Sequence, residues 1–278
     1  MSAATTWIAS YPKSGNTWLR VVIRAWRDGG PVDINQLGSG GIASGREPFD
    51  VALGLASSDL TYDEADALRP RVDETLAAAA DDPLLRKIHD GFYVAAGGEP
   101  VVSIQATRSA VYLVRDPRDV AVSYAHHLGV PVEDAAERMC DPEATIADPP
   151  SRLAEQLRQR LGTWSDHVRS WVDEAPFPVH VMRYEDCLAD PAATFGAALE
   201  FAGLGPVDPG PLATALEHAD FAGLREAELR HGFRERLHPA SAFFRRGRAG
   251  SWSDEMAPEV AARIVAAHGD VMARFDYV

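Results

Sequence analysis

Hydrophobic positions along the chain fall into two alternating patterns. Short apolar runs, which are typical of buried strands, occur at 6–10, 84–89, 111–114 and 179–183. Apolar residues at helical spacing predict helices over 17–26, 63–80, 152–174, 191–202 and 258–275. The alternation predicts an α/β protein: a three-layer fold whose central, mostly parallel sheet is flanked by helices. Ligands of such folds bind at the carboxyl ends of the strands.

The remaining segments carry weaker signals. Residues 28–62 are rich in Gly, Ser and Pro and are expected to form mostly loops. Pro117 suits the first turn of a helix after the third strand. A Pro/Gly-rich break at 205–211 precedes further helices and a basic loop at 245–250. The 278 residues fit one domain over 1–278 better than two small ones.

Charge narrows the range of partners. The net charge of −14 argues against a nucleic-acid partner and against general electrostatic binding to acidic membranes. An anionic ligand would therefore need a local basic pocket within an acidic protein. With 46% hydrophobic and 24% charged residues, the chain has the composition of an ordinary globular protein.

The cysteines and the lengths of the apolar stretches favour a reducing, cytoplasmic location. Cys140 and Cys187 supply neither a disulfide framework nor a zinc ligand set, which suits a reducing environment. No apolar stretch approaches the length that spans a bilayer, and the first residues lack a basic signal-peptide region. We expect a cytoplasmic protein without a membrane or a metal partner.

The first strand leads into a loop of small hydroxyl residues. Residues 7–20 read WIASYPKSGNTWLR, so that an apolar run enters a loop with one Lys and one Gly and leaves as an amphipathic helix. Backbone N–H groups, a helix N-terminus and an ammonium would then face one anion. Lys13 precedes Gly15, whereas a Walker A loop places Lys after Gly. The pattern predicts a phosphate-like ligand held differently from ATP or GTP.

Lys87 and His89 come at the end of the second predicted strand. Residues two apart on a strand point to the same face, so the ammonium and the imidazole would project together. A neighbouring cation disfavours the charged imidazole, which suits a general base. Taken alone, a structural His at a strand end is the favoured interpretation.

Arg115 ends the third predicted strand, in the segment RDPRD at 115–119. Its guanidinium can bind a phosphate with two parallel hydrogen bonds, and Ser123, about two turns along the next helix, can add a hydroxyl. An Arg–Asp salt-bridge cluster that caps the helix is an equally good interpretation.

Two further segments complete the candidate set. Tyr184 follows the fourth predicted strand and could contact a base, although a Tyr buried at a sheet edge is the more common case. Residues 243–252 read FFRRGRAGSW, the densest positive charge in the chain. Glycines let backbone amides approach an anion while guanidinium groups neutralise it. A solvated charge run is the weaker interpretation here.

Together and in this order, these motifs resemble those of cytosolic-type sulfotransferases, which use 3′-phosphoadenosine 5′-phosphosulfate (PAPS). The segments that carry the resemblance are 11–18, 87–89, 115–119 with Ser123, 184–186 and 244–252. They extend from residue 11 to residue 252 and so cover most of the chain. Residues 7–13 are also similar to bacterial sulfotransferases that act on natural products.

The resemblance implies where the donor would bind. A P-loop-like loop for the 5′-phosphosulfate would consist of Lys13, Ser14, Gly15, Asn16, Thr17 and Trp18, with Trp18 against the adenine. The 3′-phosphate would be bound by Arg115, Ser123, Arg245, Arg246 and Gly247. Two aromatic rings, Tyr184 and Phe221, would contact the adenine.

The resemblance also implies the reaction. His89 would be the catalytic base, Lys13 would act at the bridging oxygen and Lys87 would bind the sulfonate. A sulfonyl group would pass in line to a hydroxyl or nitrogen of a small-molecule acceptor, leaving adenosine 3′,5′-bisphosphate (PAP), with no metal required. The family's C-terminal dimerisation motif is not recognisable after Trp252, which leaves the oligomeric state open.

Two other functions and the acceptor stay open. A nucleotide-dependent kinase of similar fold, or a binding protein that has lost catalysis, would fit parts of the pattern. The acceptor could be a phenol, an alcohol, a sugar or a peptide-derived natural product. It would be bounded by 26–85 and 228–244, where Phe49, Tyr62, Phe233 and Phe243 could line an apolar pocket or belong to the core.

Overall fold

The computed structural model describes residues 4–38, 40–149, 152–237, 240 and 242–278. Internal contacts divide the chain into two compact units. The first unit contains Met1–Tyr11, Ser39–Tyr112 and Pro142–Val181. The second unit contains Pro12–Gly38, Leu113–Asp141 and Met182–Val278. The assignment of one domain over 1–278 stays a prediction.

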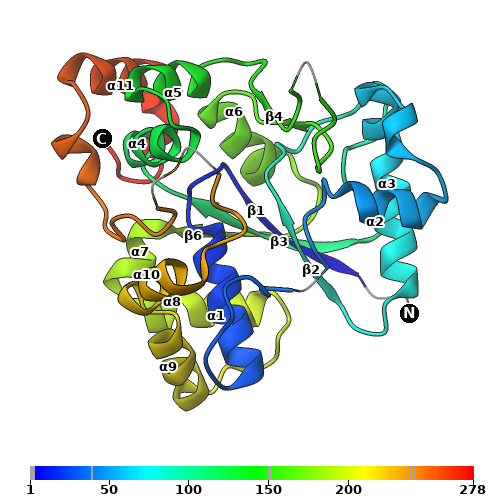
Figure 1. Ribbon diagram of the computed structural model, residues 1–278, viewed down its shortest axis with the longest axis horizontal. Helices are drawn as coiled ribbons and strands as arrows, with labels where there is room; N and C mark the ends of the chain where they lie inside the picture. The colour runs from blue at the N-terminus through cyan, green and yellow to red at the C-terminus, as the bar shows by residue number, and fades with distance from the viewer. Residues whose placement is uncertain (1–3, 39, 150–151, 238–239, 241) are drawn as a thin grey trace. The chain divides into compact units, whose positions relative to one another are not determined.

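The main sheet has four strands in the order β2-β1-β3-β6 (Figure 1). Its strands are β1 (Thr5–Ser10), β2 (Leu84–Ile88), β3 (Thr107–Val114) and β6 (Val179–Arg183). β1 and β2 run parallel, with Thr5 opposite Leu84 and Ala9 opposite Ile88. Every residue of β1 is buried, as expected for a parallel strand covered on both faces. These strands confirm the predicted α/β class and its mostly parallel sheet.

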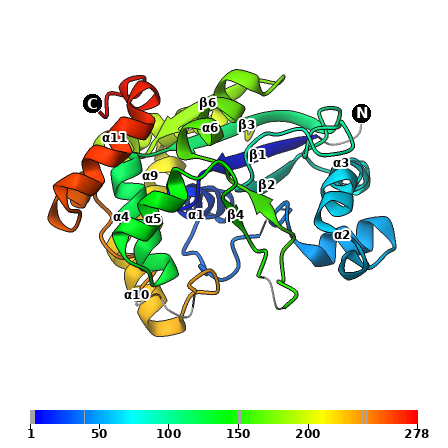
Figure 2. The ribbon, with the colours of Figure 1, turned by 90° about the horizontal axis from the view of Figure 1, so that it is seen from above.

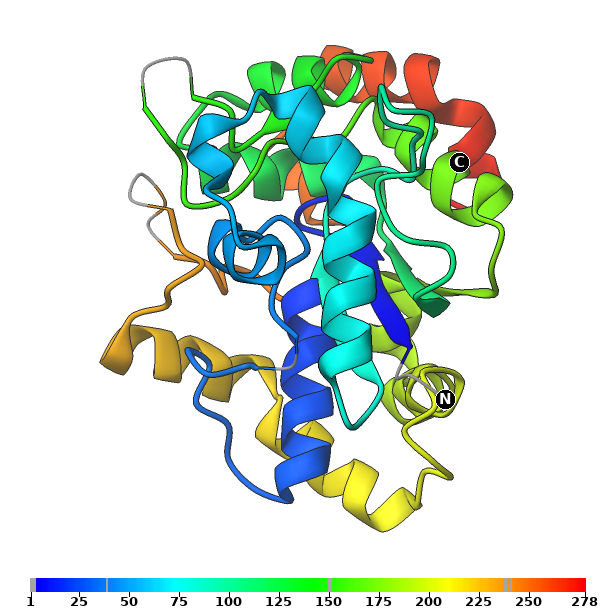
Figure 3. The same cartoon turned by 90° about the vertical axis from the view of Figure 1, so that its right-hand side faces the viewer.

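The helices of the first unit are α2 (Arg46–Leu53), η1 (Ser57–Asp59), α3 (Tyr62–Ala79), α6 (Trp164–Arg169) and η2 (Ser170–Glu174). The same unit contains a separate antiparallel pair of short strands, β4 (Thr145–Ile146) and β5 (Gln159–Arg160). Thr61 and Glu64 form a capping box that fixes the start of α3, the long cyan helix of Figure 3. Asp73 of α3 pairs with Arg86 of β2 in the buried interior.

Helices of the second unit form two groups. α1 (Asn16–Asp28) packs on α8 (Pro191–Phe201) and α9 (Pro209–His218). α4 (Pro117–Leu128), α5 (Val132–Met139) and α11 (Pro258–Ala273) lie together, as Figure 2 shows. The remaining helices are α7 (Tyr184–Ala189), α10 (Phe221–His231) and η3 (Ser251–Asp254).

One predicted segment is wrong and another is incomplete. The described residues of 28–62 are mostly loop, as predicted, but they also contain α2 and η1. The segment 152–174 is predicted as one helix. It contains the short strand β5 at 159–160 and a helix that begins only at Trp164. Gly162 adopts a left-handed φ of 63°, and the Thr163 hydroxyl caps the new helix by accepting from the Asp166 amide at 3.1 Å. Helical spacing of apolar residues extends through this break and hides it.

Within residues 4–38, 40–149, 152–237, 240 and 242–278, no helix is both long enough and apolar enough to cross a bilayer.

Candidate functional site

The loop after β1 has the backbone of an anion cradle. Lys13 and Gly15 both adopt left-handed φ angles, 70° and 106°, and the Gly15 carbonyl accepts the Trp18 amide at 2.9 Å. Among the described residues, no side chain forms a capping hydrogen bond at the N-terminus of α1, where the positive end of the helix dipole favours an anion. The Ser14 hydroxyl is buried without a hydrogen-bond partner among the described residues. These features fit a phosphate or sulfate group.

Gly15 is required by both space and conformation. A Cβ at this position would lie 2.9 Å from Cδ2 of Tyr184, at a φ that L side chains rarely adopt. Gly15→Ala should therefore lower the free energy of unfolding by about 1–3 kcal/mol, measured by urea denaturation. Gly30→Ala is the matched control, because nothing lies within 4 Å of its added Cβ. Equal stability of the two variants would contradict this account of the loop.

Arg115 connects the loop to the basic segment of the second unit. Its Nη1 donates to the Lys13 carbonyl at 3.2 Å, and its Nη2 donates to the Arg248 carbonyl at 3.3 Å. The guanidinium lies 4.3 Å from the Tyr184 ring centroid and 3.7 Å from an Asp119 carboxylate oxygen. Arg115 is 9% exposed, and its buried Nε has no hydrogen-bond partner within the described part of the chain. The residue is thus held in place with donor capacity to spare.

Three arginines of the basic loop share two carboxylates. Arg245 pairs with Glu255 at 2.7 Å, and Arg246 pairs with Asp254 at 2.6 Å and with Glu255 at 3.0 Å. Arg248 also pairs with Asp254. The hydrogen bond from Arg246 is the largest cause that holds the pKa of the Asp254 carboxyl below its usual value. The predicted basic segment is therefore an ion-pair cluster with one more cation than anion.

Asp119 fixes the end of this loop on α4. Its carboxylate accepts from the Gly250 amide at 2.7 Å, the Ser251 hydroxyl at 3.2 Å and the Trp252 amide at 2.8 Å. The sequence offered Asp119 only as one member of a possible salt-bridge cluster. Ser123 lies further along α4 and is half-buried.

Aromatic rings surround Trp18 of the loop. The indole Nε1 donates to the Ala219 carbonyl at 3.0 Å. Its ring meets those of Tyr184 and Phe195 edge-on, at centroid distances of 5.8 and 5.0 Å. Burial, the largest cause, raises the pKa of the Tyr184 phenol, which stays neutral. Two predicted adenine contacts, Trp18 and Tyr184, therefore lie together.

Phe221 packs beneath the basic loop. Gly247 has a φ of 61°, and a Cβ there would lie only 2.3 Å from the Phe221 ring. The aromatic ring and the loop glycine, both predicted for the donor site, are therefore in direct contact. Phe221 begins α10, which Asp220 caps by accepting from the amides of Ala222 and Gly223.

Glu235 is an unpredicted member of the cradle. It accepts from the Thr17 hydroxyl at 3.2 Å and pairs with Arg20 at 2.6 Å. Its neighbours in the sequence, Arg234 and Arg236, give the local pattern of a solvated charge run, which carries no signal for a contact with the loop.

The predicted acceptor aromatics divide into two groups. Phe233 and Phe243 contact each other at 4.7 Å, and the Lys13 ammonium lies 3.6 Å from the Phe243 ring centroid. Phe49 instead is buried in a cluster with Ala65 and Val72 of α3 and with Leu157, which agrees with the core alternative. Tyr62 is 36% exposed and stacks against Arg158. Parts of the predicted 26–85 and 228–244 boundaries, at 39, 238–239 and 241, lie outside the described residues.

Lys87 and His89 belong to the first unit, whereas Lys13 and the other residues predicted for the donor site belong to the second. The His89 Nδ1 lies 2.8 Å from the carbonyl of Ser10, the last residue of β1. A carbonyl only accepts, so Nδ1 donates and the Nε2 nitrogen carries the lone pair. This tautomer presents Nε2 as the basic atom.

Buried charges hold the segment that follows His89. Arg69 of α3 donates to both carboxylate oxygens of Asp90, at 2.8 and 2.7 Å, and neither side chain is more than 2% exposed. Such a pair is geometrically specific, since both guanidinium donors meet both oxygens. It ties the end of β2 to α3.

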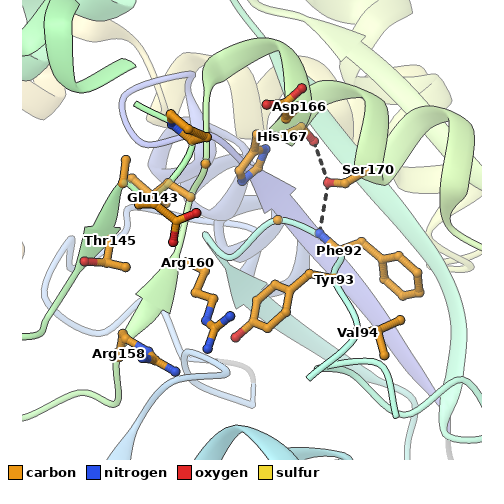
Figure 4. Close-up of a pocket in the computed structure, with 15 residues that line it drawn as sticks. Phe92, Tyr93, Val94, Glu143, Thr145, Arg158, Arg160, Asp166, His167 and Ser170 are labelled. Carbon is orange, nitrogen blue, oxygen red and sulfur yellow. Dashed lines mark hydrogen bonds between the residues drawn. The ribbon is translucent and has the colours of Figure 1, made fainter. Parts of the chain in front are cut away.

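A pocket of about 370 Å³ opens in the first unit (Figure 4). Its wall combines residues 91–94 with residues from 142–170. Arg158 and Arg160 face it, and both pair with Asp63, at 2.7 and 2.8 Å. The sequence does not reveal this pocket, because its two segments are distant along the chain.

A parallel sheet whose first strand leads through a Lys-Gly loop to a helix N-terminus defines an α/β protein of the P-loop-like kind. The sulfotransferase domain family model matches residues 4–276. The chain belongs to the sulfotransferase family.

Relatives agree with this assignment. Cytosolic sulfotransferase 16 of Arabidopsis thaliana is 26% identical over 271 residues, which cover 92% of this chain and 72% of that protein. Flavonol 3-sulfotransferase of Flaveria bidentis is 23% identical over 281 residues, with 92% and 78% covered.

Solved structures share the fold. Mouse sulfotransferase SULT7A1, complexed with PAP, aligns with a TM-score of 0.60 and 18% identity over 97% of this chain and 84% of its own. Retinol dehydratase, in a complex with retinol and PAP, aligns with a TM-score of 0.60 and 19% identity, covering 98% and 82%.

Proposed function

We propose that this sulfotransferase takes its sulfonyl group from PAPS and transfers it to a hydroxyl of a small-molecule acceptor, releasing PAP. The observation that carries the proposal is the position of Arg115 between the Lys13 loop and the Arg248 segment. A donor with phosphate at both its 5′ and 3′ ends needs two anion sites held at a fixed spacing. Structures of relatives complexed with PAP support this choice of donor.

The donor's two ends would use different parts of the second unit. The 5′-phosphosulfate would be bound by Lys13, Ser14, Gly15, Asn16 and Thr17. The 3′-phosphate would be bound by Arg115, Ser123, Arg245, Arg246 and Gly247. The adenine would contact Trp18, Tyr184 and Phe221. The orphaned Ser14 hydroxyl and Arg115 Nε are the donors that such a ligand would satisfy.

His89 would act as the general base. Its Nε2 accepts the acceptor's hydroxyl proton while the acceptor oxygen forms a bond to sulfur and the bond from sulfur to the bridging phosphate oxygen breaks. Lys13, the loop amides and the N-terminus of α1 stabilise the negative charge that collects on the leaving phosphate. Lys87 would bind the sulfonate oxygens. After the transfer, the proton of the acceptor hydroxyl is on His89. The electron pair of the broken bond between sulfur and oxygen is on the phosphate oxygen of PAP.

The acceptor would bind near Lys13. Phe243 covers the Lys13 ammonium and contacts Phe233, which gives that end of the cradle an apolar wall. A phenol or an alcohol with an apolar body fits this wall better than a free sugar does. The complex of retinol dehydratase with retinol, an alcohol with an apolar body, supports this choice.

A thermal-shift experiment tests the donor assignment. PAP without added metal should raise Tm by several degrees, since a ligand at 100 times its Kd stabilises by about 2.7 kcal/mol. MgATP should have a much smaller effect. Stabilisation by MgATP and not by PAP would favour a kinase and overturn the proposal.

Arg115→Met isolates the proposed 3′-phosphate site. The PAP-induced shift, taken relative to the variant's own Tm, should fall to a small fraction of the wild-type value. Arg230→Met is the control, because Arg230 forms an exposed pair with Glu226 on α10. A full PAP response in Arg115→Met would remove Arg115 from the site.

A further inference from the structure

One face of α6 and η2 holds the backbone that follows β2. Three side chains at helical spacing form these hydrogen bonds: His167 Nε2 to the His89 carbonyl at 3.0 Å, Trp171 Nε1 to the Asp90 carbonyl at 2.9 Å, and the Phe92 amide to Ser170 Oγ at 3.0 Å. Figure 4 shows His167 and Ser170 beside this segment, at the wall of the pocket. All these residues belong to the first unit.

His167 has a defined hydrogen-bonding direction. It is 1% exposed, and burial, partly opposed by backbone hydrogen bonds, lowers its pKa to about 4, so the ring is neutral at pH 7. Its Nε2 must donate, because the His89 carbonyl only accepts. Its Nδ1, 2.9 Å from the hydroxyl of Tyr112, must then accept, and the Tyr112 hydroxyl donates.

The same chain of hydrogen bonds returns to β1. The backbone amide of Tyr11 donates to the Tyr112 hydroxyl, and the Tyr11 ring meets the His167 ring edge-on at 5.3 Å. The neighbouring Ser10 carbonyl accepts from His89 Nδ1 at 2.8 Å. His89 is therefore held at its ring by one end of this chain and at its carbonyl by the other.

We propose that His167, oriented by Tyr112, is a positioning residue that fixes the backbone of His89 so that its Nε2 is placed for proton abstraction. The proposal rests on the proposed role of His89 as general base. Misplacing a catalytic group by about 1 Å can cost roughly 10²-fold in rate. Both anchors of His89 are fixed to buried groups, so loss of one leaves the ring able to move.

Two variants of His167 separate positioning from bulk. His167→Gln keeps an N–H for the His89 carbonyl and an oxygen for Tyr112, whereas His167→Phe keeps a ring and loses both nitrogens. We expect kcat to fall by about 10–100-fold in His167→Phe and by less than about fivefold in His167→Gln. KM for PAPS and the affinity for PAP should stay unchanged in both.

Ser170→Ala is the matched control. It removes a hydrogen bond to the same segment, at Phe92 instead of His89, and should change kcat by less than about twofold. The acidic limb of the kcat–pH profile, which the general base sets, should move in His167→Phe only. NMR of the His89 imidazole nitrogens should show a changed tautomer balance or titration midpoint in that variant, with or without an acceptor.

The possible outcomes separate the two hypotheses. Wild-type kcat and an unchanged His89 NMR signal in a folded His167→Phe variant overturn the positioning role. Equal losses in His167→Phe, His167→Gln and Ser170→Ala also overturn it, because they point to the segment as a whole. A wild-type protein that neither binds PAP nor transfers a sulfonyl group overturns the proposed function, while the NMR comparison still decides the positioning role.

Discussion

Replacement of His89 by alanine is expected to lower kcat for sulfonyl transfer by about 10²–10⁴-fold, the usual contribution of general-base catalysis. The Nδ1 hydrogen bond to the Ser10 carbonyl leaves Nε2 as the basic atom. Without the ring, no other group described for the site takes the acceptor's proton. PAP affinity should be retained, because PAP lacks the sulfonate and every residue proposed to bind its two phosphates and adenine belongs to the second unit.

His231→Ala is the control for this variant, since His231 is exposed at the end of α10. Initial rates with saturating PAPS, together with PAP titration by calorimetry, provide the measurements. A His89→Ala enzyme with near-normal kcat would remove His89 from the mechanism. Loss of PAP binding in parallel with kcat would instead indicate a wider structural defect.

Replacement of Arg69 by methionine is expected to lower the free energy of unfolding by about 3–5 kcal/mol. Removing the guanidinium leaves the carboxylate of Asp90 buried without its two charge-assisted donors. The side chain of Asp90 is 0% exposed and cannot turn to water without local unfolding. Because Asp90 follows His89, kcat should fall as well, even at temperatures at which the variant is folded.

Arg24→Met gives the comparison with an exposed ion pair. Arg24 pairs with Asp28 one helical turn away at the surface of α1, where such a pair contributes only a few tenths of a kcal/mol. Urea denaturation of both variants measures the difference. If the two variants lose similar free energies of unfolding, the buried pair of Arg69 and Asp90 contributes no more to stability than the exposed pair of Arg24 and Asp28.

Local patterns were sufficient to predict the sheet and the loop. The strands at β1, β2 and β6 follow from short apolar runs, and the cradle follows from Lys13 and Gly15 between a strand and a helix. The helix over 152–174 could not be predicted correctly, because Gly162 and Thr163 break a spacing that remains helical on both sides. Intrinsic signals of two residues outweigh the periodicity there.

Contacts between distant segments could not be predicted in the same way. Glu235 reaches Thr17 only through the fold. His167 has the spacing of an ordinary buried helix residue. Its hydrogen bond goes to a backbone carbonyl, which every residue carries, so the type of the accepting residue does not indicate the contact. The motifs therefore name the residues expected to touch the donor, and they omit those that hold these residues in place.

The ion pairs of the basic loop affect how the donor competes with salt. Arg245 and Arg246 pair with Asp254 and Glu255. A 3′-phosphate at the proposed site would exchange with these carboxylates instead of meeting hydrated cations. Added salt screens the internal pairs as well as the pairs with the phosphate. Ionic strength thus weakens the ion pairs of the free protein and those of the proposed complex alike. The affinity for the donor is therefore expected to depend only weakly on salt concentration.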